Sequence, residues 1–221
     1  MSDPVRWAAI FDWDGVIVDS SRPHEESWNR LAEEEGRTLP DDHFKKGFGM
    51  TGERIIRDVL DWTRDPEEVR RLTRKKGEYY REIVRSEGIE ALPGVLDWME
   101  RLNAAGIPMA VASSTSRENI QLVLERLGLE SYFRGIVSGD EVKRGKPEPD
   151  VFLAAADRIG MAPGRCVVFE DAQVGIDAAR AAGMRVVAVT TTHPADRLKG
   201  AVRIANRLDE LSIKEVSEWF K

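Results

Sequence analysis

Two carboxylates, two residues apart, follow the first apolar segment of the chain. Asp12 and Asp14 stand in the sequence FDWDGV, directly after residues 7–11, a short apolar run that is typical of a buried strand. An aspartate at the end of a buried strand is costly unless a metal ion or an opposite charge offsets it. One of these side chains could attack an electrophile covalently and the other could transfer a proton.

Further polar side chains come after later apolar segments. They are Ser113 with Ser114, Lys146, and Glu170 with Asp171. Strands of a parallel sheet all end at the same edge, so these groups can converge although they are far apart in sequence. Carboxylates, a hydroxyl and an ammonium are the groups that a hard, oxygen-liganded ion such as Mg²⁺ and a phosphate require. The sequence therefore predicts a site for Mg²⁺ and phosphate at one edge of a sheet.

The elements that must position these groups alternate along the chain. Short apolar runs without polar alternation predict strands covered on both faces, at 7–11, 108–112, 135–138, 166–169 and 186–189. Amphipathic helical patterns lie between most of them, at 95–103, 119–127, 150–159 and 174–181. This alternation predicts an α/β fold with a Rossmann-like, doubly wound parallel sheet. The threonine-rich segment 190–194, after the last of these runs, is interpreted as a turn.

Residues 20–88 break the alternation. They contain helical patterns at 24–35 and 53–62, and a third helix is expected to start at Asp65, which can cap it, with Pro66 in its first turn. A structureless loop of this length is uncommon inside a compact domain. We therefore expect an inserted α-helical cap at 20–88 and a core made of 1–19 and 89–221.

Together these motifs resemble the haloacid dehalogenase superfamily, and specifically its β-phosphoglucomutase-like phosphohydrolases, which carry a helical cap after the first motif. The resemblance extends over essentially the whole chain. It rests on four motifs in order, namely FDWDGV, the hydroxyl of Ser113, Lys146 followed by proline, and Glu170-Asp171.

The resemblance implies a role for each of these residues. Asp12 is the expected nucleophile that forms an aspartyl-phosphate, and Asp14 the general acid and base. The implied Mg²⁺ ligands are Asp12, Asp14 through its backbone carbonyl, Glu170 and Asp171. The implied phosphate contacts are Lys146, Ser113 and a backbone amide near Ser114. An aspartate at position 14 points to phosphatase or phosphomutase chemistry within the superfamily.

Substrate choice is expected to depend on the cap. His24 has the spacing of the first hinge region in the mutase, although on a charged helix it could equally be a hydrated surface residue. Arg54 lies in the segment where the family's specificity loop is found and could contact a distal group of the substrate. Lys75 and Lys76 both lie near the family's cap lysine, and the sequence does not decide between them.

Three functions remain open at this point. The first is a phosphatase for a small phosphorylated metabolite such as a sugar phosphate, and the second is a β-phosphoglucomutase-type phosphomutase. Arg54 falls later after the glycines than in the mutase pattern, which favours the phosphatase. The third is a regulatory module phosphorylated on aspartate, but such receivers are much shorter and lack a helical insert.

The bulk properties fit a globular enzyme. The chain has 221 residues and a net charge of −6, which argues weakly against a nucleic-acid partner. No apolar run approaches the roughly 20 residues that cross a bilayer, and Asp3 and Pro4 do not fit a secretory leader. The single cysteine, Cys166, excludes an intramolecular disulfide. We expect a cytoplasmic protein, by default a monomer, with no membrane partner.

Overall fold

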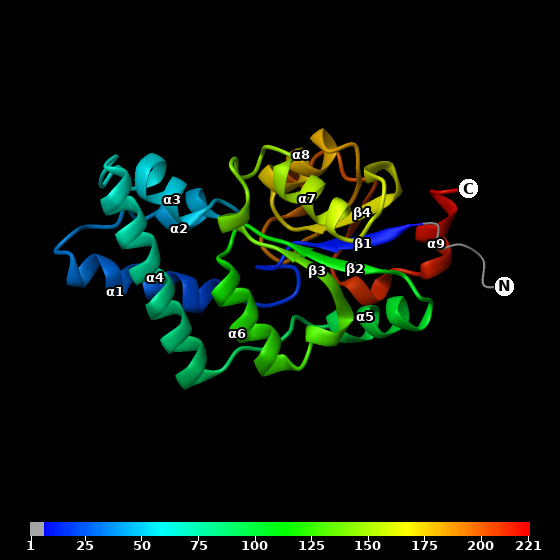
Figure 1. Ribbon diagram of the computed structural model, residues 1–221, viewed down its shortest axis with the longest axis horizontal. Helices are drawn as coiled ribbons and strands as arrows, with labels where there is room; N and C mark the ends of the chain where they lie inside the picture. The colour runs from blue at the N-terminus through cyan, green and yellow to red at the C-terminus, as the bar shows by residue number, and fades with distance from the viewer. Residues whose placement is uncertain (1–6) are drawn as a thin grey trace.

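A six-stranded parallel sheet forms the centre of the computed structural model, which describes residues 7–221 (Figure 1). Asp3 and Pro4, on which the expectation about a leader rests, lie outside the described residues. The strand order is β3-β2-β1-β4-β5-β6, and each neighbouring pair is parallel. This is the Rossmann order, so the predicted fold class is confirmed. The strands are β1 Ala8–Phe11, β2 Met109–Ala112, β3 Phe133–Val137, β4 Cys166–Glu170, β5 Arg185–Val189 and β6 Arg203–Ala205.

Helices cover both faces of this sheet. On one face lie α7 (Asp150–Arg158) and α8 (Gln173–Ala181), and on the other α5 (Val95–Ala104), α6 (Arg117–Leu127) and α9 (Ile213–Glu218) (Figure 1). Successive strand residues join opposite clusters: Ile10 packs with the α7 and α8 side, and Phe11 with the other. Phe11 stacks on Phe169 of β4, with 4.6 Å between ring centroids. A sheet buried on both faces explains why these strands have no polar alternation.

The segment between β1 and β2 forms a separate group of helices. It contains α1 (Ser21–Glu34), α2 (His43–Gly47), α3 (Gly52–Arg54) and α4 (Pro66–Glu87). These helices lie beyond the end of the sheet (Figure 1) and have a hydrophobic cluster of their own, in which Leu31 and Leu72 are fully buried. Asp65 caps α4 as expected, because its Oδ1 accepts from the backbone amides of Glu67 and Glu68 at 2.9 Å.

The two chain segments that connect this group to the sheet lie side by side. Val18 forms an antiparallel bridge with Ala91, and the amide of Leu92 donates to the carbonyl of Ile17 at 2.9 Å. The two connecting segments are therefore joined by one bridge and one further hydrogen bond, only a few residues after Asp14.

Two elements differ from the sequence prediction. The helix expected over 53–62 is only α3, followed by a π-helical turn at Ile55–Val59, and Asp61 takes a left-handed φ of 48°, which a continuing helix cannot accommodate. The short edge strand β6 was not predicted, because only three residues pair and two of them are not buried.

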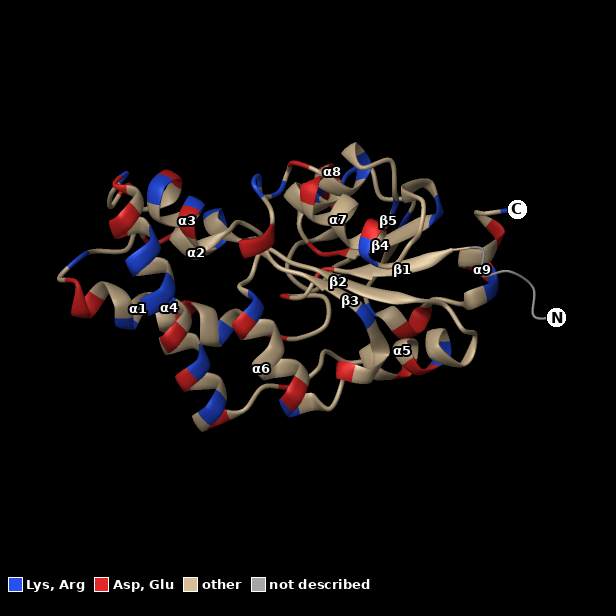
Figure 2. Ribbon diagram, in the orientation of Figure 1, with Lys and Arg blue, Asp and Glu red and all other residues tan. Residues whose placement is uncertain are grey.

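Charged residues of both signs alternate along the helices, whereas β1 and β2 carry none (Figure 2). Among the described residues, no helix is both long and apolar enough to cross a membrane.

Candidate active site

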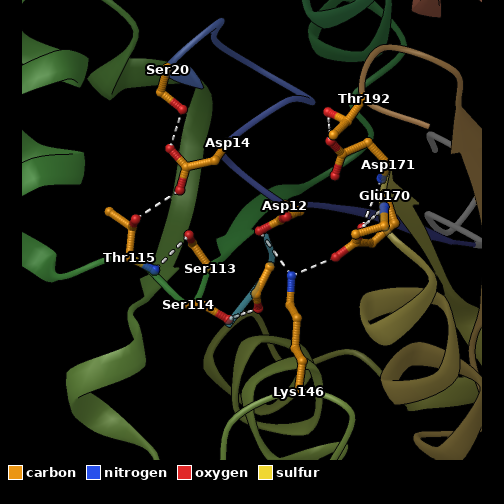
Figure 3. Close-up of polar contacts among 12 residues, drawn as sticks. Asp12, Asp14, Ser20, Ser113, Ser114, Thr115, Lys146, Glu170, Asp171 and Thr192 are labelled. Carbon is orange, nitrogen blue, oxygen red and sulfur yellow. Dashed lines mark hydrogen bonds and ion pairs between the residues drawn. The ribbon is translucent and has the colours of Figure 1, made fainter. Parts of the chain in front are cut away.

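The strand ends of the sheet bring the predicted residues to one edge (Figure 3). Asp12 follows β1, and its backbone amide donates to the carbonyl of Phe169 at 3.0 Å, which ties the first motif to β4. Ser113 follows β2 in the same way, with its amide on the carbonyl of Val137 of β3 at 3.0 Å. Glu170 is the last residue of β4, and Lys146 reaches the edge from the loop between β3 and α7.

A buried lysine lies between two carboxylates at this edge. Lys146 Nζ is 2.9 Å from Asp12 Oδ1 and 2.6 Å from Glu170 Oε1, and the three side chains are exposed by no more than 5%. Desolvation lowers the pKa of Lys146, but the two carboxylates outweigh it and hold that pKa above its usual value. A charge-assisted pair of this kind fixes both partners because neither can exchange it for water.

When all its carboxylates are ionised, the site holds more negative than positive charge. Oxygens of Asp12, Glu170 and Asp171 lie within 4.8 Å of one another, and Lys146 is the cation in contact with two of these residues. Desolvation raises the pKa of Asp12 to about 8 and raises that of Asp171 well above its usual range, and in each case the neighbouring carboxylates add to the effect. Three buried carboxylates against one ammonium leave an excess that a divalent cation would balance.

The donor set itself fits Mg²⁺. Asp12, Glu170 and Asp171 offer hard carboxylate oxygens, the type of ligand that Mg²⁺ and Ca²⁺ prefer. Asp171 Oδ1 is buried and, among the described residues, has no hydrogen-bond partner. A buried carboxylate oxygen without a partner is costly and is explained if it faces a cation.

Glu170 is anchored by the start of α8. Its Oε2 accepts from the backbone amides of Asp171 and Ala172 at 2.7 and 2.8 Å, while its Oε1 holds Lys146. Gly175, in the first turn of α8, packs directly against this carboxylate, so that a Cβ there would lie 1.6 Å from Oε1. The glycine is therefore required by the close approach of the helix to Glu170.

Asp14 is turned away from Asp12 and toward the connecting segment (Figure 3). Its Oδ1 accepts from Ser20 Oγ at 2.5 Å and is 3.0 Å from His24 Nε2, and its Oδ2 accepts from Thr115 Oγ1 at 2.7 Å. Burial raises the pKa of Asp14, but His24 and the two hydroxyls outweigh burial and bring that pKa below its usual value. The carboxylate is therefore held in its ionised form.

His24 links Asp14 to Lys76. Because Nε2 donates to Asp14, Nδ1 is left as the acceptor for Lys76 Nζ, which is in close contact with it. Tyr80 stacks on the imidazole at 4.4 Å between centroids. Burial, followed by the charge of Lys76, lowers the pKa of His24, and burial lowers the pKa of Lys76 to about 7.

The structure distinguishes the two lysines that the sequence left open. Lys76 is buried beside His24, whereas Lys75 is 36% exposed and pairs with Glu34 at 3.3 Å. The guanidinium of Arg54 is already engaged by protein groups. Its Nη1 donates to the backbone carbonyl of Lys146 at 2.6 Å, and its Nε lies 3.3 Å from Asp58.

Two serines and a threonine follow β2. Ser113 is buried, and its Oγ accepts from the amide of Thr115 at 3.0 Å, which leaves its own O–H free to donate. Ser114, expected near phosphate, uses its hydroxyl on the carbonyl of Gly49 in the helical group, at 2.8 Å. Thr115 was not singled out by the sequence, because a threonine before a helix is usually a cap.

A cavity of about 580 Å³ opens between the helical group and the strand ends. Asp12, Asp14 and Ser113 line it from the sheet, and residues of the helical group line it from the other side, among them Trp28, Phe48 and Lys76. This volume falls in the range of small-molecule sites, which is roughly 300–1,000 Å³.

The sequence of this chain is similar to a family of hydrolases and to several phosphatases. The family described as haloacid dehalogenase-like hydrolase matches residues 9–189. The chain is 36% identical to the chloroplastic 5-amino-6-(5-phospho-D-ribitylamino)uracil phosphatase of Arabidopsis thaliana, over 95% of this chain but only 57% of that protein, so it spans little more than half of this relative. It is also 36% identical to the fructose-1-phosphate phosphatase of Escherichia coli, over 81% of this chain and 94% of the relative.

Among solved structures, the fold is similar to β-phosphoglucomutase from Clostridium difficile. The TM-score is 0.84 at 28% identity, and the match covers 96% of each chain.

Replacing Gly175 by alanine should destabilise the protein. The added methyl group displaces Glu170 from Lys146, and breaking a buried ion pair costs about 3–5 kcal/mol, which exceeds the gain of about 1 kcal/mol that alanine brings to a helix. Gly164→Ala is the matched control, because a Cβ there meets nothing within 4 Å. The free energy of unfolding in urea should fall in Gly175→Ala alone; equal stability of the two variants would contradict the close packing at Glu170.

Lys76→Met should stabilise the protein most at neutral pH. Because the pKa of Lys76 falls from 10.5 to about 7 on folding, the unfolded state binds more protons between these values, and the wild type loses stability as pH decreases through this window. Methionine takes up no proton, so the stability difference between variant and wild type should be largest at pH 7 and shrink toward pH 10.

Urea unfolding at pH 7 and pH 9.5 measures this difference. Lys75→Met, at the partly exposed neighbour, is the control and should not follow the same pH pattern. A Lys76→Met advantage that is constant or grows with pH would show that the buried lysine does not carry the effect.

Proposed function

This chain belongs to the haloacid dehalogenase-like hydrolases, and we propose that it is a magnesium-dependent phosphatase that releases phosphate from a small phosphorylated metabolite through an aspartyl-phosphate on Asp12. The observation that carries the proposal is the position of Asp12: a buried carboxylate paired with Lys146 at 2.9 Å, next to Glu170 and Asp171, and open to the cavity.

In the proposed reaction an oxygen of Asp12 attacks phosphorus and the bond from phosphorus to the leaving oxygen breaks. Asp12, Glu170, Asp171 and the backbone carbonyl of Asp14 would hold Mg²⁺, which when bound offsets the repulsion between a carboxylate and a phosphate. Lys146 uses two of its three N–H donors on Asp12 and Glu170, so the third remains for a phosphoryl oxygen. The free O–H of Ser113 is a second donor for the same oxygens.

Asp14 would move the protons. Once free of the hydrogen bonds that hold it ionised, it would take up a proton and donate it as general acid to the leaving oxygen, and as general base it would then take one from the water that attacks the aspartyl-phosphate. In the structure it is held away from Asp12 by Ser20, His24 and Thr115. We therefore propose that Asp14 rotates out of these hydrogen bonds during each turnover. His24 lies on α1 and Ser20 directly precedes that helix. Because both residues bind Asp14, its rotation is coupled to any movement of the helical group.

Residues 20–88 are proposed to act as a cap that closes on the strand ends. The contacts of Gly49 with Ser114 and of Arg54 with the carbonyl of Lys146 connect the two parts across the cavity. A closed cap keeps bulk water from the reacting groups. In this arrangement Arg54 supports closure, and it contacts substrate only if it leaves the Lys146 carbonyl.

Two observations favour hydrolysis over the mutase reaction. A mutase must bind a second phosphate, which requires cations in the cap that face the cavity. Arg54 is engaged by the Lys146 carbonyl and Asp58, Arg57 by Glu53, and Lys76 by His24. The lowered pKa of Lys76 further weakens it as a phosphate ligand.

The phosphatases of Arabidopsis and Escherichia coli are relatives at 36% identity, which also supports hydrolysis over the mutase reaction.

Phosphate release from a panel of phosphorylated metabolites and p-nitrophenyl phosphate tests the proposal. With Mg²⁺, the wild type should turn over many times, and Asp12→Asn should release none. Asp14→Ala should lose turnover by about 10²–10⁴-fold, since it removes the proton transfer, yet bind Mg²⁺ because its carbonyl remains.

Each alternative has its own outcome in this experiment. Interconversion of β-glucose phosphates without net phosphate release would identify a mutase. A single phosphorylation event per protein, without repeated hydrolysis, would identify a regulatory module. Full activity of Asp14→Ala would remove Asp14 from the chemistry.

A further inference from the structure

The threonine-rich segment after β5 lies against the metal-ligand candidates. Residues 190–194 were expected to form only a turn, but β5 ends at the same edge of the sheet as β1 and β4. The hydroxyl of Thr192 donates to Asp171 Oδ2 in a close contact (Figure 3). Thr191 Oγ1 donates to the carbonyl of Gly15 at 2.5 Å. One short segment thus contacts both the fourth motif and the first.

The hydrogen bond from Thr192 makes the two carboxylate oxygens of Asp171 different. Oδ2 is occupied by the threonine hydroxyl, whereas Oδ1 is buried and has no partner among the described residues. Without the hydroxyl, the carboxylate could rotate about its last bond, because that torsion is soft. With the hydroxyl in place, Oδ1 is the oxygen left for a cation.

Gly15 closes the other side of this pair. A Cβ at Gly15 would lie 1.9 Å from Asp171 Oδ2 and 2.7 Å from Thr192 Oγ1, so the hydrogen bond is packed directly on the Gly15 backbone. Gly15 has a φ of 76°, and its amide donates to the carbonyl of Val18 at 2.9 Å. The turn that carries Asp12 and Asp14 therefore also packs against the hydrogen bond between Asp171 and Thr192.

Segment 190–194 is also bonded to β6 and to the residue that follows it. The amide of Thr190 donates to the carbonyl of Ala205 in β6 at 3.0 Å, and Thr190 Oγ1 is 2.9 Å from Asn206 Oδ1. The start of the segment that carries Thr192 is thus tied to the sheet. A hydroxyl held in this way can orient a carboxylate that would otherwise adjust freely.

We propose that Thr192 is a positioning residue for the divalent cation, acting through its hydrogen bond to Asp171. The inference rests on the metal site of the proposed function. Groups that orient metal ligands in this way typically contribute 10–100-fold in metal affinity. Thr192 itself does not ligate the ion, so its effect appears in ion binding rather than in binding of the phosphate substrate.

Divalent-ion binding to the substrate-free protein tests the proposal directly. Titration with Mn²⁺, followed by electron paramagnetic resonance of the free ion, gives the dissociation constant, and Mg²⁺ competition gives that of Mg²⁺. Thr192→Val keeps the shape of the side chain but removes the hydroxyl, and should weaken binding about tenfold. Thr192→Ser restores the hydroxyl without the methyl group and should bind within about twofold of the wild type.

Thr190→Val is the matched control. It removes a hydroxyl from the same segment, but one that contacts Asn206 and not Asp171, so ion affinity should not change. Equal affinity of Thr192→Val and wild type would overturn the inference, and so would a Thr192→Ser variant as weak as Thr192→Val, because that would assign the effect to methyl packing. If Thr192→Val does not fold, the Thr192→Ser and Thr192→Ala pair gives the same comparison.

Failure of this inference can be told apart from failure of the proposed function. If the wild type binds neither Mn²⁺ nor Mg²⁺, the metal site itself is wrong. If the wild type binds both and all Thr192 variants bind equally well, only the role of Thr192 is wrong.

Discussion

The cluster of buried carboxylates at one edge of the sheet is the constraint on which the rest of the structure depends. Asp12, Glu170 and Asp171 lie together with Lys146 as the ammonium that binds two of them. Such an arrangement is unstable unless a cation joins it and every remaining polar atom is held in place. That requirement is served by the amides of Asp171 and Ala172 just before α8, by the glycines at 15 and 175, and by the hydroxyl of Thr192.

The same edge also connects to the helical group. Asp14 lies two residues after Asp12 but is bonded to Ser20 and His24, on the side of the helices, and to Thr115, on the side of the sheet. The Asp14 carboxylate therefore contacts both the helical group and the sheet. In the proposed mechanism, Asp14 would therefore link chemistry at Asp12 to movement of the helices, alongside the contacts of Ser114 with Gly49 and of Arg54 with Lys146.

Much of the fold and of the candidate site could be predicted from the sequence, because both depend on local patterns. Apolar runs without alternation located five of the six strands, and the rule that parallel strands end at one edge brought Asp12, Lys146 and Asp171 together. Thr192 and Thr115 could not be found in this way. A threonine after a strand or before a helix has the local pattern of a turn or cap residue, and its partner is distant in sequence. The choice between Lys75 and Lys76 likewise required the rotation of α4, which tertiary packing sets.

Thermal unfolding of the wild type at increasing Mg²⁺ shows whether the buried carboxylates bind a divalent cation, because an ion that binds only the folded state stabilises it in proportion to ln(1 + [Mg²⁺]/Kd). The unfolding temperature should rise steadily with Mg²⁺, and the folded state should gain about 2.7 kcal/mol of stability at a hundredfold excess over Kd. Sodium chloride of equal ionic strength should give no such rise. If the two salts shift the unfolding temperature equally, the buried carboxylates do not form a cation site.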